Sequence, residues 1–327
     1  MYTVDSCTGG LTATGTVATG SSPNEPTSED MVLSSSGKFL YVANLISNAA
    51  DLATISMYTI NPSTGVLTPT TPATVSTGFL PQGIAIDPSG KFVYTANSDD
   101  NTVSIFTIDA TTGLLTPATP PSVAAGWSPL SVTVDPSGRF AYAANQDDDT
   151  VSMYTVNANT GALTPMTPAT VKTGFSPFGV TVAPSGKFAY VPNTYDSQNS
   201  ISQYSIDPVT GILTPNSPTT ATAGNQPTAV AVDPSSKFAY VTNRTDGTIS
   251  MFAIDPSTGN LSPTGTIQAG ALPFRITFDP SGKFVYVANE SSAISIYSFG
   301  SNGVLTPAGL ATTQNGGSLA VAVTPAK

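Results

Sequence analysis

The chain has 327 residues and a formal net charge of −10, yet only 9% of its residues are charged, against about a quarter in ordinary globular proteins. It contains no histidine and one cysteine, Cys7. This excludes the usual zinc ligand sets, Ser–His and Cys–His catalytic pairs and an internal disulfide. The sequence has no basic stripe and no apolar run long enough to cross a membrane, so we expect neither nucleic-acid binding nor a membrane span.

The first predicted element is a hairpin at 1–12, MYTVDSCTGGLT, which is similar to MYTVNANTGALT at 153–164. In both segments an apolar, β-branched run leads into a glycine turn and a second run. The same turn recurs along the chain with its glycine at Gly9, Gly65, Gly113, Gly161, Gly211, Gly259 and Gly303.

A second motif, clearest as DPSGKFVYVANE at 279–290, recurs at intervals of about 50 residues, a period typical of repeat architectures. Each copy belongs to a unit of four segments rich in Val, Ile, Tyr, Phe and Thr and bounded by turn-forming residues, which favours strands. No segment sustains a helical apolar period. The turn position of the motif is occupied by Gly37, Gly90, Gly138, Gly186, Ser236 and Gly282.

These repeats predict an all-β fold, a seven-bladed β-propeller with four-stranded antiparallel blades. Six units are complete, and the last segment, SLAVAVTP at 318–325, matches only a first strand. We expect a single domain over 1–327, with the seventh blade split between 1–20 and 316–327 and closed by both termini. The second strand of that blade is missing from the sequence, so the blade has three strands or the chain is part of a longer protein.

Each complete unit also repeats a tyrosine within its second strand and an asparagine at the end of that strand. We interpret the tyrosines as packing between blades and the asparagines as buried amides that anchor loops. The tyrosines are Tyr41, Tyr94, Tyr142, Tyr190, Tyr240 and Tyr286. The asparagines are Asn44, Asn97, Asn145, Asn193, Asn243 and Asn289.

Alternating strands place every loop on one of two faces, and the loops after the second and fourth strands carry nearly all of the net charge of −10. We call this the top face. We interpret its paired acids as turn caps, since aspartate bonds its own backbone in turns. The alternative is a weak Ca²⁺ site; otherwise we expect no metal and no cofactor. The acids that would form the Ca²⁺ site are Asp99 with Asp100, or Asp147 with Asp148 and Asp149.

The strings YVTN at 240–243 and YVAN at 41–44 and 286–289, with the PSGK turns and the LTP segments, resemble the YVTN and lactonase-like seven-bladed propellers over essentially the whole chain. That family includes bacterial 6-phosphogluconolactonases, muconate-lactonising relatives and surface-layer propellers without catalysis. In its lactonase branch the resemblance implies a Pro-Arg-His stretch and an Asn-Glu pair. Here Pro273-Phe274-Arg275 and Asn289-Glu290 stand at these places, with Phe274 at the arginine position and Arg275 at the histidine position.

The first strands should begin at the mouth of the propeller channel, where a mixture of apolar and polar groups suits a small ligand. Arg275 would either bind that ligand or form a salt bridge with Glu29, Asp30 or Glu290. The predicted ligand-binding residues are Glu29, Asp30, Gln82, Phe178, Thr228, Phe274 and Arg275.

A chain rich in Thr, Asn and Pro and poor in Lys favours a secreted or cell-surface protein. We expect a monomeric extracytoplasmic propeller that acts as a binding or surface-structural module through its acidic top face, with a small molecule or protein at the channel mouth. The alternative is a hydrolase of a neutral lactone, with Glu290 as general base and Arg275 stabilising the oxyanion.

Overall fold

The computed structural model describes residues 1–19, 27–45, 53–291, 293–313 and 320–324, with the backbone alone at 27–29. These residues form strands and turns without any helix, so none of them belongs to a helix that could cross a membrane. The chain divides into two compact units, and each is described by itself. Unit 1 is Met1 with 15–172, and unit 2 is 2–14 with 173–327.

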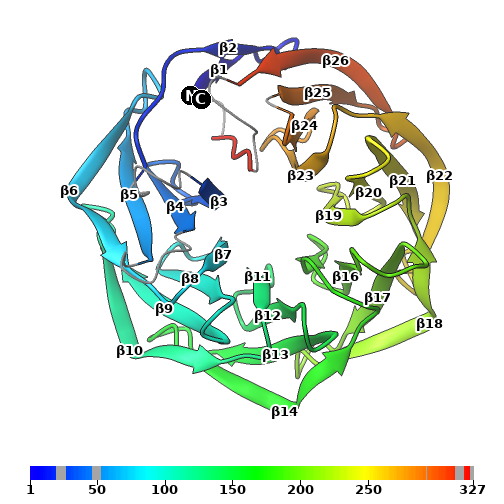
Figure 1. The fold of residues 1–327 in the computed structure, drawn as a ribbon, viewed down its shortest axis with the longest axis horizontal. Helices are drawn as coiled ribbons and strands as arrows, with labels where there is room; N and C mark the ends of the chain where they lie inside the picture. Colours follow the sequence, from blue (N-terminus) through cyan, green and yellow to red (C-terminus); the bar gives the residue numbers. More distant parts are fainter. Residues whose placement is uncertain (20–26, 46–52, 292, 314–319, 325–327) are drawn as a thin grey trace. The chain divides into compact units, whose positions relative to one another are not determined.

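Unit 1 contains three four-stranded antiparallel sheets, each with its strands in chain order (Figure 1). The first comprises β3 (Thr27–Leu33), β4 (Phe39–Leu45), β5 (Thr54–Ile60) and β6 (Leu67–Ser76). The second comprises β7 (Pro81–Ile86), β8 (Phe92–Asn97), β9 (Thr102–Ile108) and β10 (Leu115–Ala124). The third comprises β11 (Pro129–Val134), β12 (Phe140–Asn145), β13 (Thr150–Val156) and β14 (Leu163–Lys172).

Unit 2 contains three further sheets of the same kind and one two-stranded sheet. The first comprises β15 (Thr181–Val182), β16 (Phe188–Pro192), β17 (Ser200–Ile206) and β18 (Leu213–Thr222). The second comprises β19 (Pro227–Val232), β20 (Phe238–Asn243), β21 (Thr248–Ile254) and β22 (Leu261–Gln268). The third comprises β23 (Pro273–Phe278), β24 (Phe284–Asn289), β25 (Ala293–Phe299) and β26 (Leu305–Thr312). The small sheet pairs β1 (Tyr2–Val4) with β2 (Leu11–Ala13).

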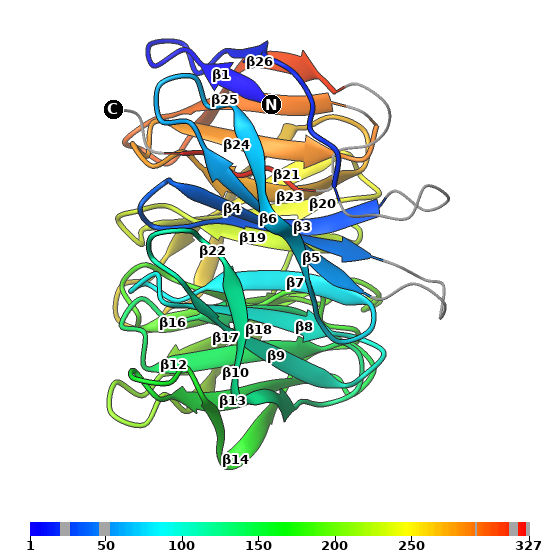
Figure 2. The same ribbon diagram turned by 90° about the vertical axis from the view of Figure 1, so that its left-hand side faces the viewer.

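The predicted fold class is confirmed: the sheets are the four-stranded antiparallel blades of a propeller, with one partial blade. In the partial blade the hairpin β1–β2 lies beside β25 and β26 (Figure 2), and the Tyr2 hydroxyl donates to the Thr312 carbonyl at 2.8 Å. Val321 and Val323 pack with this hairpin against the core of the last sheet. Residues 320–324 do not form a strand, unlike the first strand predicted over 318–325. The single domain over 1–327 stays a prediction.

The turn glycine Gly113 is required by both backbone conformation and space. Gly113 has φ 74°, in the left-handed region that disfavours residues with a Cβ. A Cβ at Gly113 would lie 2.3 Å from Cδ1 of Phe39, so the ring of one sheet occupies the space that the glycine of the next leaves open. Ser236, which replaces glycine in the second motif, adopts the same region with φ 58°.

The repeated tyrosines join neighbouring sheets, as predicted. The Tyr94 hydroxyl donates to the Gly161 carbonyl at 2.9 Å, and the Tyr240 hydroxyl donates to the Gly303 carbonyl at 2.7 Å. Both side chains are fully buried. Burial raises the pKa of both phenols well above the usual range, because removal from water disfavours the phenolate.

The repeated asparagines are buried and anchor loops, also as predicted. Nδ2 of Asn97 donates to Thr102 Oγ1 at 3.0 Å and to Ser104 Oγ at 2.8 Å, which ties the end of β8 to β9. In four sheets this asparagine pairs with the proline that begins the first strand; these pairs are Pro81–Asn97, Pro129–Asn145, Pro227–Asn243 and Pro273–Asn289. We call this end of each sheet the asparagine edge. The loops predicted for the top face leave the sheets there.

Candidate functional site

The predicted catalytic residues of unit 2 lie at the asparagine edge of the last sheet. Pro273 begins β23 opposite Asn289 at the end of β24, and Arg275 pairs in register with Ala288. Glu290 follows β24 directly, and its backbone N–H donates to the Leu272 carbonyl at 3.0 Å. The antiparallel register therefore brings Arg275 and Glu290 to the same end of one sheet.

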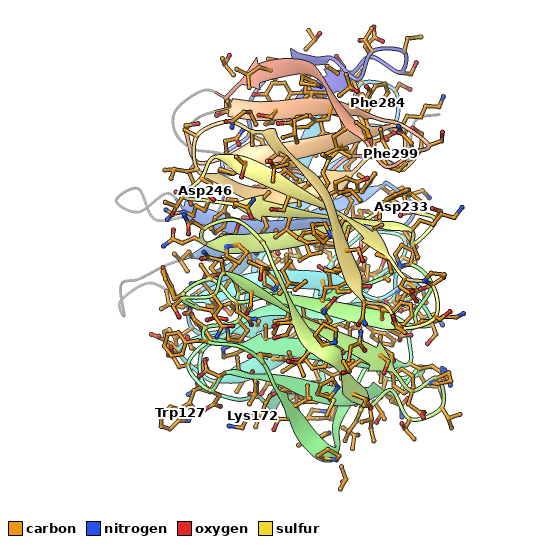
Figure 3. The ribbon with its side chains drawn as sticks, turned by 90° about the vertical axis from the view of Figure 1, so that its right-hand side faces the viewer. Trp127, Lys172, Asp233, Asp246, Phe284 and Phe299 are labelled. Atoms are coloured by element: carbon orange, nitrogen blue, oxygen red, sulfur yellow. The ribbon has the colours of Figure 1, made fainter. Side chains whose placement is uncertain are left out.

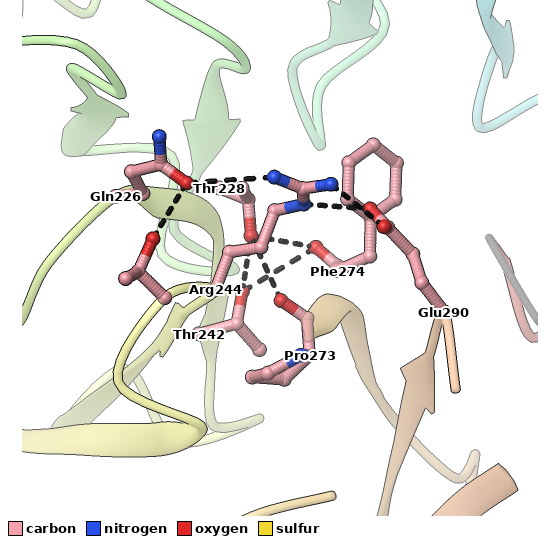
Figure 4. Close-up of polar contacts among 8 residues, drawn as sticks. Gln226, Thr228, Thr242, Arg244, Pro273, Phe274 and Glu290 are labelled. Atoms are coloured by element: carbon pink, nitrogen blue, oxygen red, sulfur yellow. Dashed lines mark hydrogen bonds and ion pairs between the residues drawn. The ribbon is translucent and has the colours of Figure 1, made fainter. Parts of the chain in front are cut away.

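Glu290 forms a bidentate ion pair with Arg244, which follows β20 in the neighbouring sheet (Figure 4). Arg244 Nε donates to Oε1 and Nη2 donates to Oε2, both at 2.7 Å. The side chains are 32% and 20% exposed. The hydrogen bond to Glu290 raises the pKa of Arg244, and the opposite charge adds to the effect although burial opposes it. Such a two-point contact fixes the orientation of the carboxylate as well as its charge.

Gln226 supports the ion pair from the loop before β19. Its Oε1 accepts a hydrogen bond from Thr245 Oγ1 at 2.7 Å and from Arg244 Nη1 at 3.4 Å. The guanidinium of Arg244 is thereby held on one side by Gln226 and on the other by Glu290.

Arg275 lies against two aromatic rings. Its guanidinium carbon is 5.9 Å from the centroid of the Phe178 ring and 5.8 Å from that of Phe274, within the range of a cation–π contact. The two rings meet edge to face, with centroids 5.2 Å apart. The structure thus brings together three of the predicted ligand-binding residues, and it pairs Glu290 with Arg244 rather than with Arg275.

Thr228 contacts one member of this group, Phe274, and is 1% exposed. Its hydroxyl contacts Thr242 Oγ1 at 3.0 Å and the Phe274 carbonyl at 2.9 Å (Figure 4). Thr228 therefore connects β19 to β20 and to the start of β23, which holds Phe274 in place.

The remaining predicted site residues belong to unit 1. Asp30 Oδ1 accepts the backbone N–H of Met31 at 3.0 Å, and its Oδ2 accepts that of Ile84 at 3.4 Å. Gln82 is half-buried in β7. The side chain of Glu29 lies outside the described residues.

The acidic loops of unit 1 cap turns. Asp100 Oδ2 accepts the backbone N–H of Phe79 at 2.8 Å, and Asp148 Oδ2 accepts that of Trp127 at 2.6 Å. Within the described part of the chain no three acidic or cysteine side chains are grouped to hold a metal ion. The weak Ca²⁺ site stays a prediction.

Arg244 and Gln226 were not predicted as site residues, although the sequence holds a signal for Arg244. Arg244 and Glu290 occupy the same repeat position, directly after Asn243 and Asn289. Opposite charges at one position of successive blades indicate a contact between those blades. Gln226 has no comparable signal, because its role depends on the path of the loop before β19.

Chemically, the site combines an oriented carboxylate with a guanidinium on an aromatic support. A carboxylate can accept a proton from water, and a guanidinium can donate hydrogen bonds to an oxygen that gains negative charge.

The described fold is that of an all-β propeller. A family model described as Lactonase, 7-bladed beta-propeller, matches residues 1–128 and 131–321, and the chain belongs to this family. No curated protein matches the chain.

Several solved structures share the fold. A Bacteroides uniformis protein assigned as a 6-phosphogluconolactonase is 22% identical, with a TM-score of 0.81 over 96% of this chain and 92% of that one. A Lactobacillus plantarum protein is 23% identical, with a TM-score of 0.79 over 96% and 92%. The Pseudomonas aeruginosa periplasmic gluconolactonase PpgL is 22% identical, with a TM-score of 0.77 over 99% and 94%. At these identities the likeness shows the fold.

Proposed function

We propose that this protein hydrolyses a lactone at the asparagine edge of its last sheet. The observation that carries the proposal is the oriented carboxylate of Glu290 at the same sheet end as Arg275. Membership of the lactonase propeller family supports the reaction class, and so do the names of the gluconolactonase and 6-phosphogluconolactonase that share the fold.

In the proposed reaction Glu290 takes a proton from a water molecule whose oxygen attacks the lactone carbonyl carbon. The carbonyl oxygen gains a negative charge, and Arg275 donates a hydrogen bond to it. The ring C–O bond then breaks, and the released alkoxide takes the proton back from Glu290. The product is the open-chain hydroxy acid.

The ion pair with Arg244 fixes the orientation of the Glu290 carboxylate, because two of its hydrogen bonds reach both carboxylate oxygens. We therefore assign Arg244 a positioning role in the proposed reaction.

We propose a neutral lactone as the substrate. The net charge of −10 repels a phosphorylated sugar acid. In addition, the positive charge of Arg244 is already compensated by Glu290. Phosphate recognition normally relies on uncompensated Arg or Lys groups.

The test follows hydrolysis of a panel of neutral sugar lactones by pH-stat, with the spontaneous rate subtracted. We expect Glu290→Gln to lower kcat by about 10²–10⁴-fold, the usual contribution of a general base, with little change in KM. Arg275→Ala should also lower kcat, while Lys283→Gln, in the turn at the opposite end of the same sheet, should have no effect. Folded wild-type protein without activity above the spontaneous rate, or full activity of Glu290→Gln, would refute the proposal.

The role of the top face as a binding or surface-structural module stays a prediction, and the family match favours the hydrolase over it. The extracytoplasmic location and the monomeric state likewise remain predictions from composition. A small molecule or protein at the channel mouth is the partner that either function would need.

A further inference from the structure

Large aromatic side chains project from the turns that join the last strand of one sheet to the first strand of the next. Phe79, between β6 and β7, is 45% exposed, and Trp127, between β10 and β11, is 67% exposed. The side chain of Trp127 is labelled in Figure 3. Phe175 holds the same position in unit 2 and is 60% exposed. Exposed apolar groups that gather on one surface mark a candidate interaction site.

The turn itself does not need an aromatic residue. The equivalent positions of unit 2 also hold Asn225 and Ala271. The backbone N–H of Asn225 donates to Asp246 Oδ2 at 2.8 Å, just as that of Trp127 donates to Asp148. The same capped turn therefore forms around asparagine, so the aromatic ring of Trp127 is not required by the fold.

These turns hold the aromatic residues in fixed positions. A Cβ at Gly78, which precedes Phe79, would lie 2.5 Å from Asn97 Nδ2 and 2.7 Å from Asp100 Oδ2, so the turn packs directly on the edge of its sheet. The next turn is tied to the same loop, because the backbone N–H of Ser128 donates to Asn101 Oδ1 at 2.8 Å. A rigid aromatic group loses little conformational entropy on binding.

A pocket of about 390 Å³ lies beside the Phe79 turn. Its lining carries one charged group, the Asp100 carboxylate, together with several hydroxyl groups. Carboxylate and hydroxyl oxygens accept hydrogen bonds from an ammonium or guanidinium. The residues that line it are Ser76, Thr77, Gly78, Asp100, Thr102, Ser104, Phe106, Pro117, Pro121 and Ser122.

The surroundings of the two aromatic turns are acidic. Asp99, Asp100 and Asp147 are exposed in the loops that follow β8 and β12. Lys172 ends β14 in register with Thr150 and places one positive charge beside the second of these loops. The other basic residues of unit 1 lie at the opposite ends of the sheets; they are Lys38, Lys91 and Arg139.

We propose that the Phe79 and Trp127 turns, with the pocket beside Phe79, bind a basic polypeptide segment. An arginine or lysine of the partner stacks on Trp127, and another enters the pocket and contacts Asp100. The aromatic faces supply cation–π contacts and the acids supply the field that attracts the segment. The residues of this surface belong to unit 1, whereas those of the proposed hydrolase site belong to unit 2.

Trp127 is the single tryptophan of the chain, so its fluorescence reports directly on this surface. The test titrates the protein with a short peptide of alternating arginine and glycine, with a serine–glycine peptide and with a neutral oligosaccharide. We expect a saturable change with the arginine peptide alone, weaker at about 0.15 M salt than at low salt because the attraction is screened. A saturable response to the neutral oligosaccharide would overturn the proposal in favour of a sugar site.

Calorimetry then compares variants that keep the turn. We expect Trp127→Asn, which copies the Asn225 turn, and Asp100→Asn each to weaken peptide binding by about tenfold, the effect of one cation–π contact or one charge pair. Asp246→Asn, the equivalent cap in unit 2, should leave it unchanged. Equal binding by wild type and Trp127→Asn would mean non-specific attraction to an acidic protein and would overturn the proposal.

Discussion

The bidentate ion pair between Arg244 and Glu290 should be measurable as a coupling energy in the stability of the protein. Two charge-assisted hydrogen bonds of 2.7 Å join the side chains, and a hydrogen bond to a charged group contributes about 1.5–3 kcal/mol where it is shielded from water. Here the side chains are 32% and 20% exposed. Solvent screening therefore moves the value toward the ~0–1 kcal/mol of surface pairs.

Between these limits we expect a coupling of about 1–2 kcal/mol in the free energy of unfolding. The assay is a double-mutant cycle of Arg244→Gln, Glu290→Gln and the double variant, by urea denaturation at low salt and at about 1 M salt. Exposed charges are largely screened at the higher salt. The bidentate pair, whose side chains are partly buried, should by contrast keep part of its coupling there. Comparable m-values across the four proteins are the control for a common unfolding transition.

A coupling below about 0.5 kcal/mol at low salt, the value of a freely exposed pair, would refute this reasoning. Glu290 would then not be oriented by Arg244, and the positioning role in the proposed hydrolysis would be lost with it. The hydrolysis assay would still be informative, since it tests Glu290 itself.

Two further predictions concern the fold. Gly65 has φ 70° and no atom within 4 Å of the place that a Cβ would take. Substitution by alanine should therefore lower the free energy of unfolding by only ~1 kcal/mol, the cost of a left-handed backbone at a residue with a Cβ. Gly113→Ala should cost about 1–3 kcal/mol more, because its Cβ would strike Phe39; equal losses on urea denaturation would contradict that contact. At alkaline pH, burial raises the pKa of Tyr154 to about 12, while an unfolded tyrosine titrates near pH ~10. Above that pH the unfolded state binds fewer protons, so stability should fall by up to about 1.4 kcal/mol per pH unit for each such tyrosine. The measurement is the Tm as a function of pH, with tyrosinate absorbance recorded alongside it. A Tm that does not change between pH 8 and a pH above the pKa of an unfolded tyrosine would contradict this prediction.

Most of the fold could be predicted because the same local requirements recur in every repeat. A left-handed turn beside a neighbouring ring requires glycine at Gly113, and a tyrosine such as Tyr94 meets the next turn in each blade. Where one copy departs from the repeat pattern, the other copies still show which element that segment should form. The partial blade is the exception, since its described residues 320–324 do not form the strand predicted over 318–325.

The candidate site was harder to predict, because side-chain partners depend on loops that differ between blades. Glu290 and Arg275 could be placed at one sheet end from the register of the repeat, but the choice of Arg244 as the partner of Glu290 depends on the rotation between two blades. Thr228 shows the same limit. Its position at the start of a strand suggested a ligand contact, whereas its hydroxyl is directed to the Phe274 carbonyl.

The hairpin formed by β1 and β2 has a consequence for how the chain is made. The Tyr286 hydroxyl donates to the Gly9 carbonyl at 3.0 Å, across a separation of 277 residues, and a Cβ at Gly9 would meet the Phe284 ring at 2.4 Å. The hairpin is thus synthesised long before the strand that covers it. In the interval its apolar side chains have no native partner, so translation pauses before β24 should favour aggregation of the nascent chain.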